Sequence, residues 1–164
     1  YWYARMVYAN ENPRFIVRRL LVHAAEDVGL ADPQALLMDQ AAASALEWLG
    51  MPEARLPIAQ AIIYIATAPK SNAVLQGVDR ALKVVKSAAG AQVPVHLRDT
   101  HYAGAQKLGS GQGYKYPHDY PAHYVHQDYL PSQLRGLRLY QPTGQGREKV
   151  IRERLEYLSG FGKK

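Results

Sequence analysis

The sequence predicts an all-α protein, and three observations carry this prediction. Cap residues followed by proline, as at Asn12-Pro13 and Asp32-Pro33, alternate with glycines such as Gly50, which is the punctuation of short helices. Between these signals the apolar residues recur at helical spacing. The chain has 164 residues, 48% of them hydrophobic and none of them cysteine, so it can bury a core without disulfides. We expect one domain over residues 1–164, built as a helical bundle.

The first half of the chain divides into short helices. The residues from Tyr1 to Met6 already have the composition of a helix interior. Three longer helices are expected after them, over residues 14–28, 34–49 and 58–68. The second is rich in alanine, which favours helix and lets a neighbouring helix approach closely. The third is apolar nearly all round, so we expect it to be the buried central helix.

The second half begins with an amphipathic helix over residues 72–88, in which Val74, Val78, Leu82 and Val85 form one stripe. After it the expected elements are extended pieces at 93–95 and 139–142, a short helix over 100–108 and a last helix over 146–159. Residues 109–131 hold three glycines, three prolines, five tyrosines and three histidines without a helical period. A long irregular segment of this kind is usually functional or disordered. Its tyrosines supply apolar area, which argues for an ordered insertion.

The charge is distributed unevenly along the chain. Residues 1–69 carry five Lys/Arg against seven Asp/Glu, a net charge of −2, whereas residues 70–164 carry fifteen against seven, a net charge of +8. A basic body favours a polyanionic partner, either nucleic acid or an acidic protein tail, although a solvated surface has the same composition. The cations considered for such contacts are Lys107, Lys115, Arg135 and Arg138. The longest apolar run is about half of what a membrane span needs, so we expect no membrane contact. The absence of cysteine fits a reducing cytosol.

Searches for catalytic motifs find none that is complete. Lys70-Ser71 resembles the end of a phosphate-binding loop, but Tyr64 and Pro69 stand where that loop needs glycines. The glycines from 109 to 113 lack the last glycine of a dinucleotide fingerprint, and no nucleophile elbow is present. We therefore expect no catalytic residue, no metal and no cofactor in this chain.

The irregular segment leaves several alternatives open. Its side chains His118, Asp119, His123, His126 and Asp128 lie within eleven residues, and they either share a metal or hydrogen-bond within a packed loop. Its tyrosines could stack on bases with Lys115 nearby, anchor a protein–protein contact, or pack in a core. As candidates for an oligomer interface we take Tyr114, Tyr116, Tyr120, Tyr124 and Tyr129.

Several strings in a fixed order carry a resemblance to a known family. They are EDVGLADP at 26–33, LP at 56–57, APKSN at 68–72, GYKYPHDY at 113–120, YLP at 129–131 and YQPT at 140–143. In this order they resemble the C-terminal region of the RarA/MgsA family of replication-associated recombination ATPases, whose eukaryotic relatives are the Werner helicase-interacting proteins. The resemblance covers nearly the whole chain. It departs at residues 99–107, where the family usually has Pro-Thr and Met.

The resemblance implies a helical domain similar to the oligomerisation collar of clamp-loader subunits. It further implies homotetramers, with an AAA+ module upstream of Tyr1 that holds ATP and Mg²⁺. Full-length proteins of the family act on DNA ends and stalled forks and associate with single-stranded-DNA-binding protein, in the cytoplasm at the nucleoid. The chain is then expected to be a non-catalytic tetramerisation domain of a DNA-dependent ATPase. The alternative is a DNA-binding module that contacts fork or single-stranded DNA through the basic second half.

Overall fold

The computed structural model describes residues 1–88 and 90–160, and within them every regular element is a helix and no strand occurs. The prediction of an all-α fold is confirmed. The contacts between residues divide the chain into two compact units. Unit 1 comprises Tyr1–Asp79 and Tyr140–Arg152, and unit 2 comprises Arg80–Leu139 and Glu153–Lys164. The expectation of one domain over 1–164 stays a prediction.

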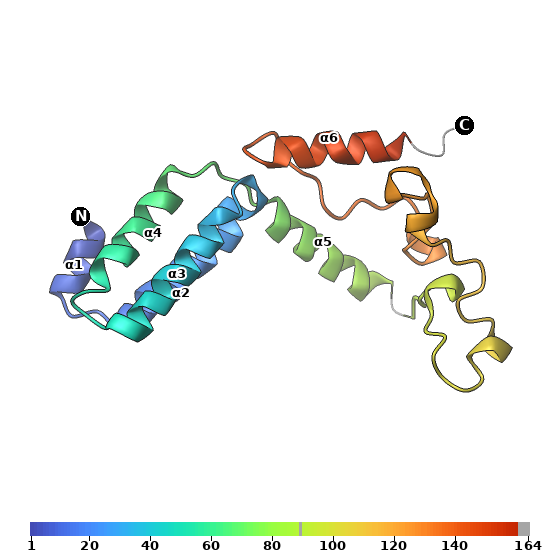
Figure 1. The fold of residues 1–164 in the computed structure, drawn as a ribbon, viewed down its shortest axis with the longest axis horizontal. Coiled ribbons are helices and arrows are strands. Elements are labelled where there is room, and N and C mark those ends of the chain that lie inside the picture. The colour runs from blue at the N-terminus through green and yellow to red at the C-terminus, as the bar shows by residue number, and fades with distance from the viewer. Residues whose placement is uncertain (89, 161–164) are drawn as a thin grey trace. The chain divides into compact units, whose positions relative to one another are not determined.

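Unit 1 contains the helices of the first half of the chain. These are α1 Trp2–Tyr8, α2 Pro13–His23, α3 Gln34–Leu49 and α4 Arg55–Thr67 (Figure 1). Helix α2 begins as predicted, because the Asn12 side chain accepts a hydrogen bond of 2.9 Å from the Arg14 N–H and proline occupies the first turn. Beyond α2 the chain continues through a π-turn, η1 Ala24–Val28, and a 3-10 turn, η2 Gly29–Ala31.

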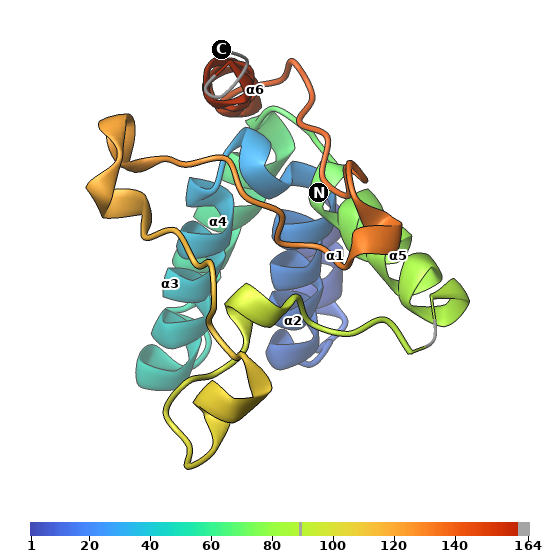
Figure 2. The same ribbon diagram turned by 90° about the vertical axis from the view of Figure 1, so that its right-hand side faces the viewer.

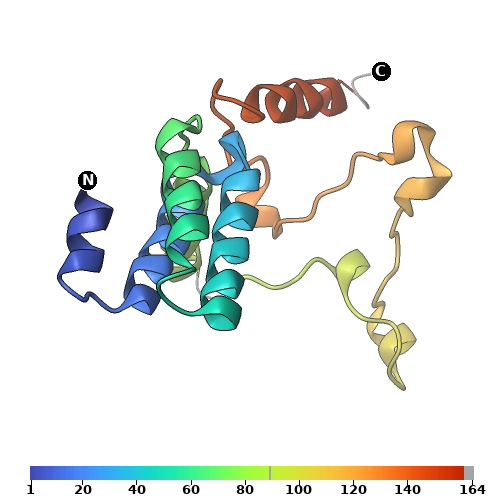
Figure 3. The same ribbon diagram turned by 60° about the vertical axis from the view of Figure 1, so that its left-hand side comes forward.

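The core of unit 1 lies among α2, α3 and α4, which run side by side (Figure 3). Its buried members come from α2, α3, α4 and the residue preceding α4, and they are Ile16, Val17, Ala42, Leu46, Ala54, Ile58 and Ala61. Small side chains at the contact positions of α3 allow the close approach that its alanines predicted. Burial of each large apolar side chain stabilises the fold by about 1.5–3 kcal/mol.

Helix α4 differs from its prediction in two respects. It begins at Arg55, one turn before the expected start. Pro57 lies in the first turn, where the backbone N–H groups have no partner within the helix and a proline is therefore tolerated. Only Ile58 and Ala61 are fully buried, whereas Leu56 and Ile63 are 69% and 64% exposed. The prediction of a helix buried on all sides is therefore wrong for a single chain, since α2 and α3 cover only one side of it.

Two further helices each have residues in both units. Helix α5, Ala73–Ser87, matches its predicted bounds within one residue, and α6, Glu148–Ser159, begins two residues after its predicted start. Both carry an apolar stripe, as the sequence indicated.

Between α5 and α6, unit 2 consists of loops and single 3-10 turns (Figure 2). The turns are η3 Val95–Leu97, η4 Ala105–Leu108, η5 Pro117–Asp119, η6 Pro121–His123 and η7 Ser132–Leu134. The helix expected over 100–108 is reduced to η4, because Gly104 has a φ of 92° and interrupts it. The irregular character of 109–131 is confirmed, and the extended pieces expected at 93–95 and 139–142 form no strand.

Candidate functional site

Three distant segments of unit 1 meet at the start of α6. The Ser71 N–H donates to the Asp27 carbonyl at 2.8 Å, and the Arg147 N–H donates to the Ala31 carbonyl at 2.8 Å. Gly146 lies so close that a Cβ at this position would stand 2.1 Å from the Ala31 carbonyl oxygen, and its φ of 49° also favours glycine. We call this meeting point the α6 junction. It joins three of the strings that carry the family resemblance, those at 26–33, 68–72 and 140–143.

Glu148 is the centre of the α6 junction and is fully buried. Its Oε2 accepts hydrogen bonds from Ser71 Oγ at 2.7 Å, from the Thr143 N–H at 2.7 Å and from Thr143 Oγ1 at 2.6 Å. Its Oε1 accepts from the Tyr140 hydroxyl at 2.8 Å. Because donors reach both carboxylate oxygens, the carboxylate holds chain segments together instead of offering a free base.

The ionisation of the α6 junction follows from these contacts. Burial alone would raise the pKa of Glu148, but the hydrogen bonds from Thr143, Ser71 and Tyr140 outweigh it and hold the pKa below its ordinary value. The pKa of Tyr140 is raised by burial and by the hydrogen bond that it donates to Glu148. At neutral pH the junction is therefore a charged carboxylate surrounded by neutral donors.

A second buried carboxylate, Asp39, lies on the inner face of α3. Within the described residues neither of its carboxylate oxygens has a hydrogen-bond partner. Burial raises its pKa to about 6, and the nearby His23 lowers it only in part. His23 itself pairs with Asp27 at the point where α2 turns into the π-turn η1. Asp39 is thus a destabilising group in unit 1 whenever it is ionised.

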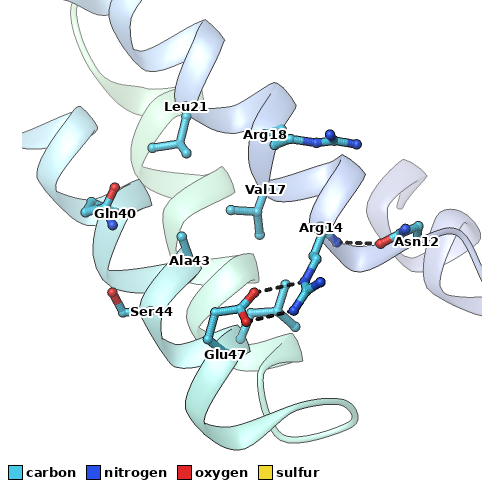
Figure 4. A pocket seen from close by; sticks show the side chains of 10 residues that line it. Asn12, Arg14, Val17, Arg18, Leu21, Gln40, Ala43, Ser44 and Glu47 are labelled. Atoms are coloured by element: carbon cyan, nitrogen blue, oxygen red, sulfur yellow. Dashed lines mark hydrogen bonds and ion pairs between the residues drawn. The ribbon is translucent and has the colours of Figure 1, made fainter.

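A pocket of about 420 Å³ opens between α2 and α3 (Figure 4). Val17 and Leu46 form its buried apolar floor, and Leu21 and Ala43 continue it. At one end the Arg14 guanidinium donates two hydrogen bonds to the Glu47 carboxylate, at 2.9 and 2.8 Å. Polar and charged side chains, Arg18, Gln40 and Ser44 among them, also line the pocket.

Large apolar side chains are exposed along three helices. On α3, Leu37 and Trp48 lie on one face at helical spacing, and Trp48 is 88% exposed. On α4 the exposed pair is Leu56 and Ile63. On α5 most of the stripe predicted from the sequence is exposed, namely Val78, Leu82 and Val85. Rows of exposed apolar residues at helical spacing mark surfaces that associate with other molecules.

The five candidate tyrosines of the irregular segment have different surroundings. Tyr114, Tyr116, Tyr120 and Tyr129 are exposed, so they are not core residues of this chain. Tyr124 is half-buried and has an interaction partner. The segment owes its order to polar contacts, as the Gln127 Nε2–H donates to the Lys115 carbonyl at 2.9 Å and to the Tyr129 hydroxyl at 3.0 Å.

The histidine cluster is organised by ring contacts. Among the described residues no three His, Cys, Asp or Glu side chains come together as a metal-ligand set. Instead the His118 ring lies between two others, with centroids 5.0 Å from the Tyr116 ring and 4.9 Å from the His123 ring. We call these three rings the aromatic ladder.

The four candidate cations occupy separate places in unit 2. Lys107 lies in η4 and Lys115 immediately before Tyr116, both exposed. Arg135 pairs with Asp128 at 2.9 Å, and the Arg138 carbonyl accepts a hydrogen bond from Arg80. No contact joins the four into one groove within the described residues, and Arg135 is already engaged by a carboxylate.

No helix among the described residues is long and apolar enough to cross a membrane.

The family profile described as "MgsA AAA+ ATPase C terminal" matches residues 1–159. The chain belongs to this family. It is 48% identical to an uncharacterized AAA domain-containing protein of Mycobacterium tuberculosis over 100% of the chain and 36% of that protein. It is 44% identical to replication-associated recombination protein A of Bacillus subtilis, over 90% of the chain and 35% of that protein. With the ATPase WRNIP1 of Dictyostelium discoideum the identity is 34%, over 86% of the chain and 16% of that protein. The chain thus spans about a third of the length of the first two relatives.

Two important residues of this MgsA C-terminal domain were missed by the sequence analysis. In the sequence Glu148 resembles an ordinary acidic residue in the first turn of a helix, where a solvated carboxylate interacts favourably with the helix dipole. Asp39 carries a usable signal, because it lies at helical spacing between Ala35 and Ala42 on a face that is otherwise apolar.

Proposed function

We propose that this chain is the non-catalytic homotetramerisation domain of a RarA-type AAA+ ATPase that acts in replication fork maintenance and recombination. The observation that supports this most is the exposed apolar surface of unit 1. Trp48 on α3 and Ile63 on α4 are both more than half exposed, in helices whose opposite sides form the core. A closed symmetric assembly buries such surface without leaving it open to aggregation.

Helix α5 adds a second surface of the same kind. Its stripe of Val78, Leu82 and Val85 is exposed, while exposed Gln76 and Lys83 lie on the other side of the helix. An amphipathic helix with an uncovered apolar face gains free energy when a second helix covers it, by about 25 cal/mol for each Å² buried.

The assigned role leaves catalysis to other parts of the protein. In this proposal ATP and Mg²⁺ bind the AAA+ module. The matched segment covers only 36% and 35% of the first two relatives, so such a module fits within their remaining length. Four joined copies would hold four such modules close together and raise their avidity for DNA and for single-stranded-DNA-binding protein. The protein would work in the cytoplasm at the nucleoid.

Multi-angle light scattering of the chain tests the assembly. One chain weighs 18.3 kDa, so a tetramer weighs about 73 kDa. We expect the mass of the tetramer to persist as the protein is diluted from about 200 μM to about 1 μM. A mass of one chain at the highest concentration would refute the proposal.

Matched substitutions locate the surface. Leu82→Asp places a charge in the exposed stripe of α5 and is expected to lower the mass, because an unpaired charge in an apolar contact costs several kcal/mol. Gln76→Asp adds the same charge on the other side of the same helix and serves as the control. Trp48→Asp tests α3 in the same way. If both apolar positions tolerate the charge with no change in mass, another surface forms the assembly.

A further inference from the structure

The aromatic ladder in unit 2 is an exposed feature that the assembly role does not use. Tyr116 is 53% exposed at one end, and His118 and His123 are exposed as well. The planes of neighbouring rings are inclined by 44° and 51°. Covering exposed aromatic rings with any apolar surface is favourable, and a second aromatic ring adds a further favourable contribution beyond the area that it buries.

The backbone beside the aromatic ladder has an unfavourable conformation at two residues. Ala122 and His123 have φ values of 58° and 50°, and neither is a glycine. Each residue in this left-handed region costs roughly 1–2 kcal/mol. This conformation ends with the His123 ring packed on His118. Two consecutive strained residues on a surface loop are the kind of feature that accompanies binding sites.

The Gln127 side chain holds the backbone of Lys115, the residue that precedes Tyr116. The Gln127 side-chain amide accepts from the Lys115 N–H at 3.3 Å and donates to its carbonyl at 2.9 Å, which fixes the backbone from which Tyr116 projects. The Lys115 side chain is exposed, and its residue directly precedes Tyr116 in the chain.

The surrounding charge selects the kind of ligand. Residues 80–139 contain eight Lys/Arg and three Asp/Glu, a net charge of +5. Two of the three acids are occupied, Asp99 by His101 at 2.8 Å and Asp128 by Arg135 at 2.9 Å. Asp119 is the one acid inside the ladder segment. A polyanion that also carries flat rings matches both the charge and the aromatic surface.

We propose that the aromatic ladder binds single-stranded nucleic acid, with bases stacking on the rings of Tyr116 and His123 and a phosphate contacting Lys115. Unpaired bases are required because the bases of a duplex stack on one another and their faces are inaccessible. None of the ladder residues belongs to the apolar stripes of α3, α4 and α5 that support the proposed assembly.

Fluorescence anisotropy with a labelled oligothymidylate of about 15 nucleotides, at about 50 mM salt, tests the site. The comparison ligand is an abasic strand of the same length, which keeps the phosphates and lacks the bases. We expect the wild-type chain to bind oligothymidylate more tightly than the abasic strand. Tyr116→Ala and His123→Ala should weaken oligothymidylate binding roughly tenfold and leave abasic binding unchanged.

Two further variants serve as controls. Tyr116→Trp retains a stacking surface and should restore binding, whereas Tyr116→Ala should not. Tyr8→Ala removes an exposed tyrosine from α1 and should bind like the wild type. Circular dichroism of each variant shows that the helices are intact.

Three outcomes would overturn the proposal. The wild type could bind neither strand, it could bind both strands equally, or Tyr116→Ala could lower the assembly mass, which would place the ladder in a protein interface. Light scattering on the same samples keeps the two proposals apart. A monomeric chain with ring-dependent oligothymidylate binding would refute the assembly role and support the ladder.

Discussion

The two units of this chain obtain their order in different ways. Unit 1 encloses an apolar core among α2, α3 and α4, in which Ile58 and Ala61 are fully buried. Between α5 and α6, unit 2 buries only Ala105 and Ser110 among the described residues, and its loops are held by contacts such as the one between Gln127 and Lys115. A core buffers a fold against surface change, whereas a set of polar loop contacts leaves most side chains free to meet a ligand. The first unit is therefore stabilised by an apolar core, and the loops of the second by polar contacts.

Hydrogen exchange should show the largest contrast between the units. Amides in α2, α3 and α4 open only through unfolding of the core, whereas amides in the loops from 91 to 135 open locally. We expect the core amides to exchange at least about a thousandfold more slowly. Mass spectrometry of peptides after exchange measures this. Similar rates in both units would remove the distinction.

Removing the carboxylate of Glu148 should have the next largest effect. Glu148→Ala leaves the buried hydroxyl of Ser71 and the half-buried hydroxyls of Thr143 and Tyr140 without their acceptor, and we expect a loss of about 3–4 kcal/mol in the free energy of unfolding. Urea denaturation followed by circular dichroism measures it, with Glu156→Ala on the exposed side of α6 as the control.

The same residue predicts a dependence on pH. The folded pKa of Glu148 lies below the ordinary value of 4.5, so its contribution to stability is present above that value and is lost as the pH falls through the folded pKa. Glu148→Ala should show less acid destabilisation than the wild type. An equal loss of stability on acidification in both proteins would contradict the assigned contacts.

Truncation of one apolar residue in each unit compares the two directly. Ile58→Ala empties a site in the core of unit 1 and should cost about 3 kcal/mol. Leu134→Ala removes a half-buried side chain in η7 of unit 2 and should cost about 1 kcal/mol, since solvent fills the space. Thermal and urea denaturation measure both. A larger loss for Leu134→Ala would show that unit 2 has an apolar core after all.

Asp39→Asn should be stabilising, with a gain smaller than the loss expected for Ile58→Ala. The folded pKa of about 6 lies above the ordinary 3.8, so the unfolded chain releases this proton first and stability falls as the pH rises between these values. Asn has no charge to bury. We therefore expect the variant to gain about 2 kcal/mol over the wild type above pH 7 and progressively less toward pH 4. A gain that does not change with pH would show that the charge is not the cause.

The helices of unit 1 could be predicted because their signals are local. Asp32-Pro33 and Gly50 gave the bounds of the helix over 34–49 without error, since caps and glycine stops act within a few residues. The side of α4 that stays uncovered could not be predicted, because its sequence is apolar all round and only the packing of α2 and α3 decides which side faces solvent.

The candidate sites were less accessible to sequence reasoning. The tyrosines and histidines of 109–131 were recognised as unusual, yet the tilted ring contact between His118 and His123 forms where the backbone is left-handed at Ala122 and His123, which no composition indicates. The contact between Ser71 and Glu148 joins positions 77 residues apart in the chain. Such pairs follow from the tertiary fold and leave no local periodicity.

The α6 junction also restricts which amino-acid substitutions the protein tolerates. Ser71, Tyr140, Thr143 and Glu148 form one hydrogen-bonded group. Exchanging Glu148 alone leaves its donors without an acceptor, and exchanging Tyr140 alone removes the hydrogen bond to Oε1. Gly146 is restricted as well, because a side chain at this position would clash with the Ala31 carbonyl oxygen. We therefore expect Tyr140 and Glu148 to covary across long evolutionary distances, while the exposed loops diverge more freely.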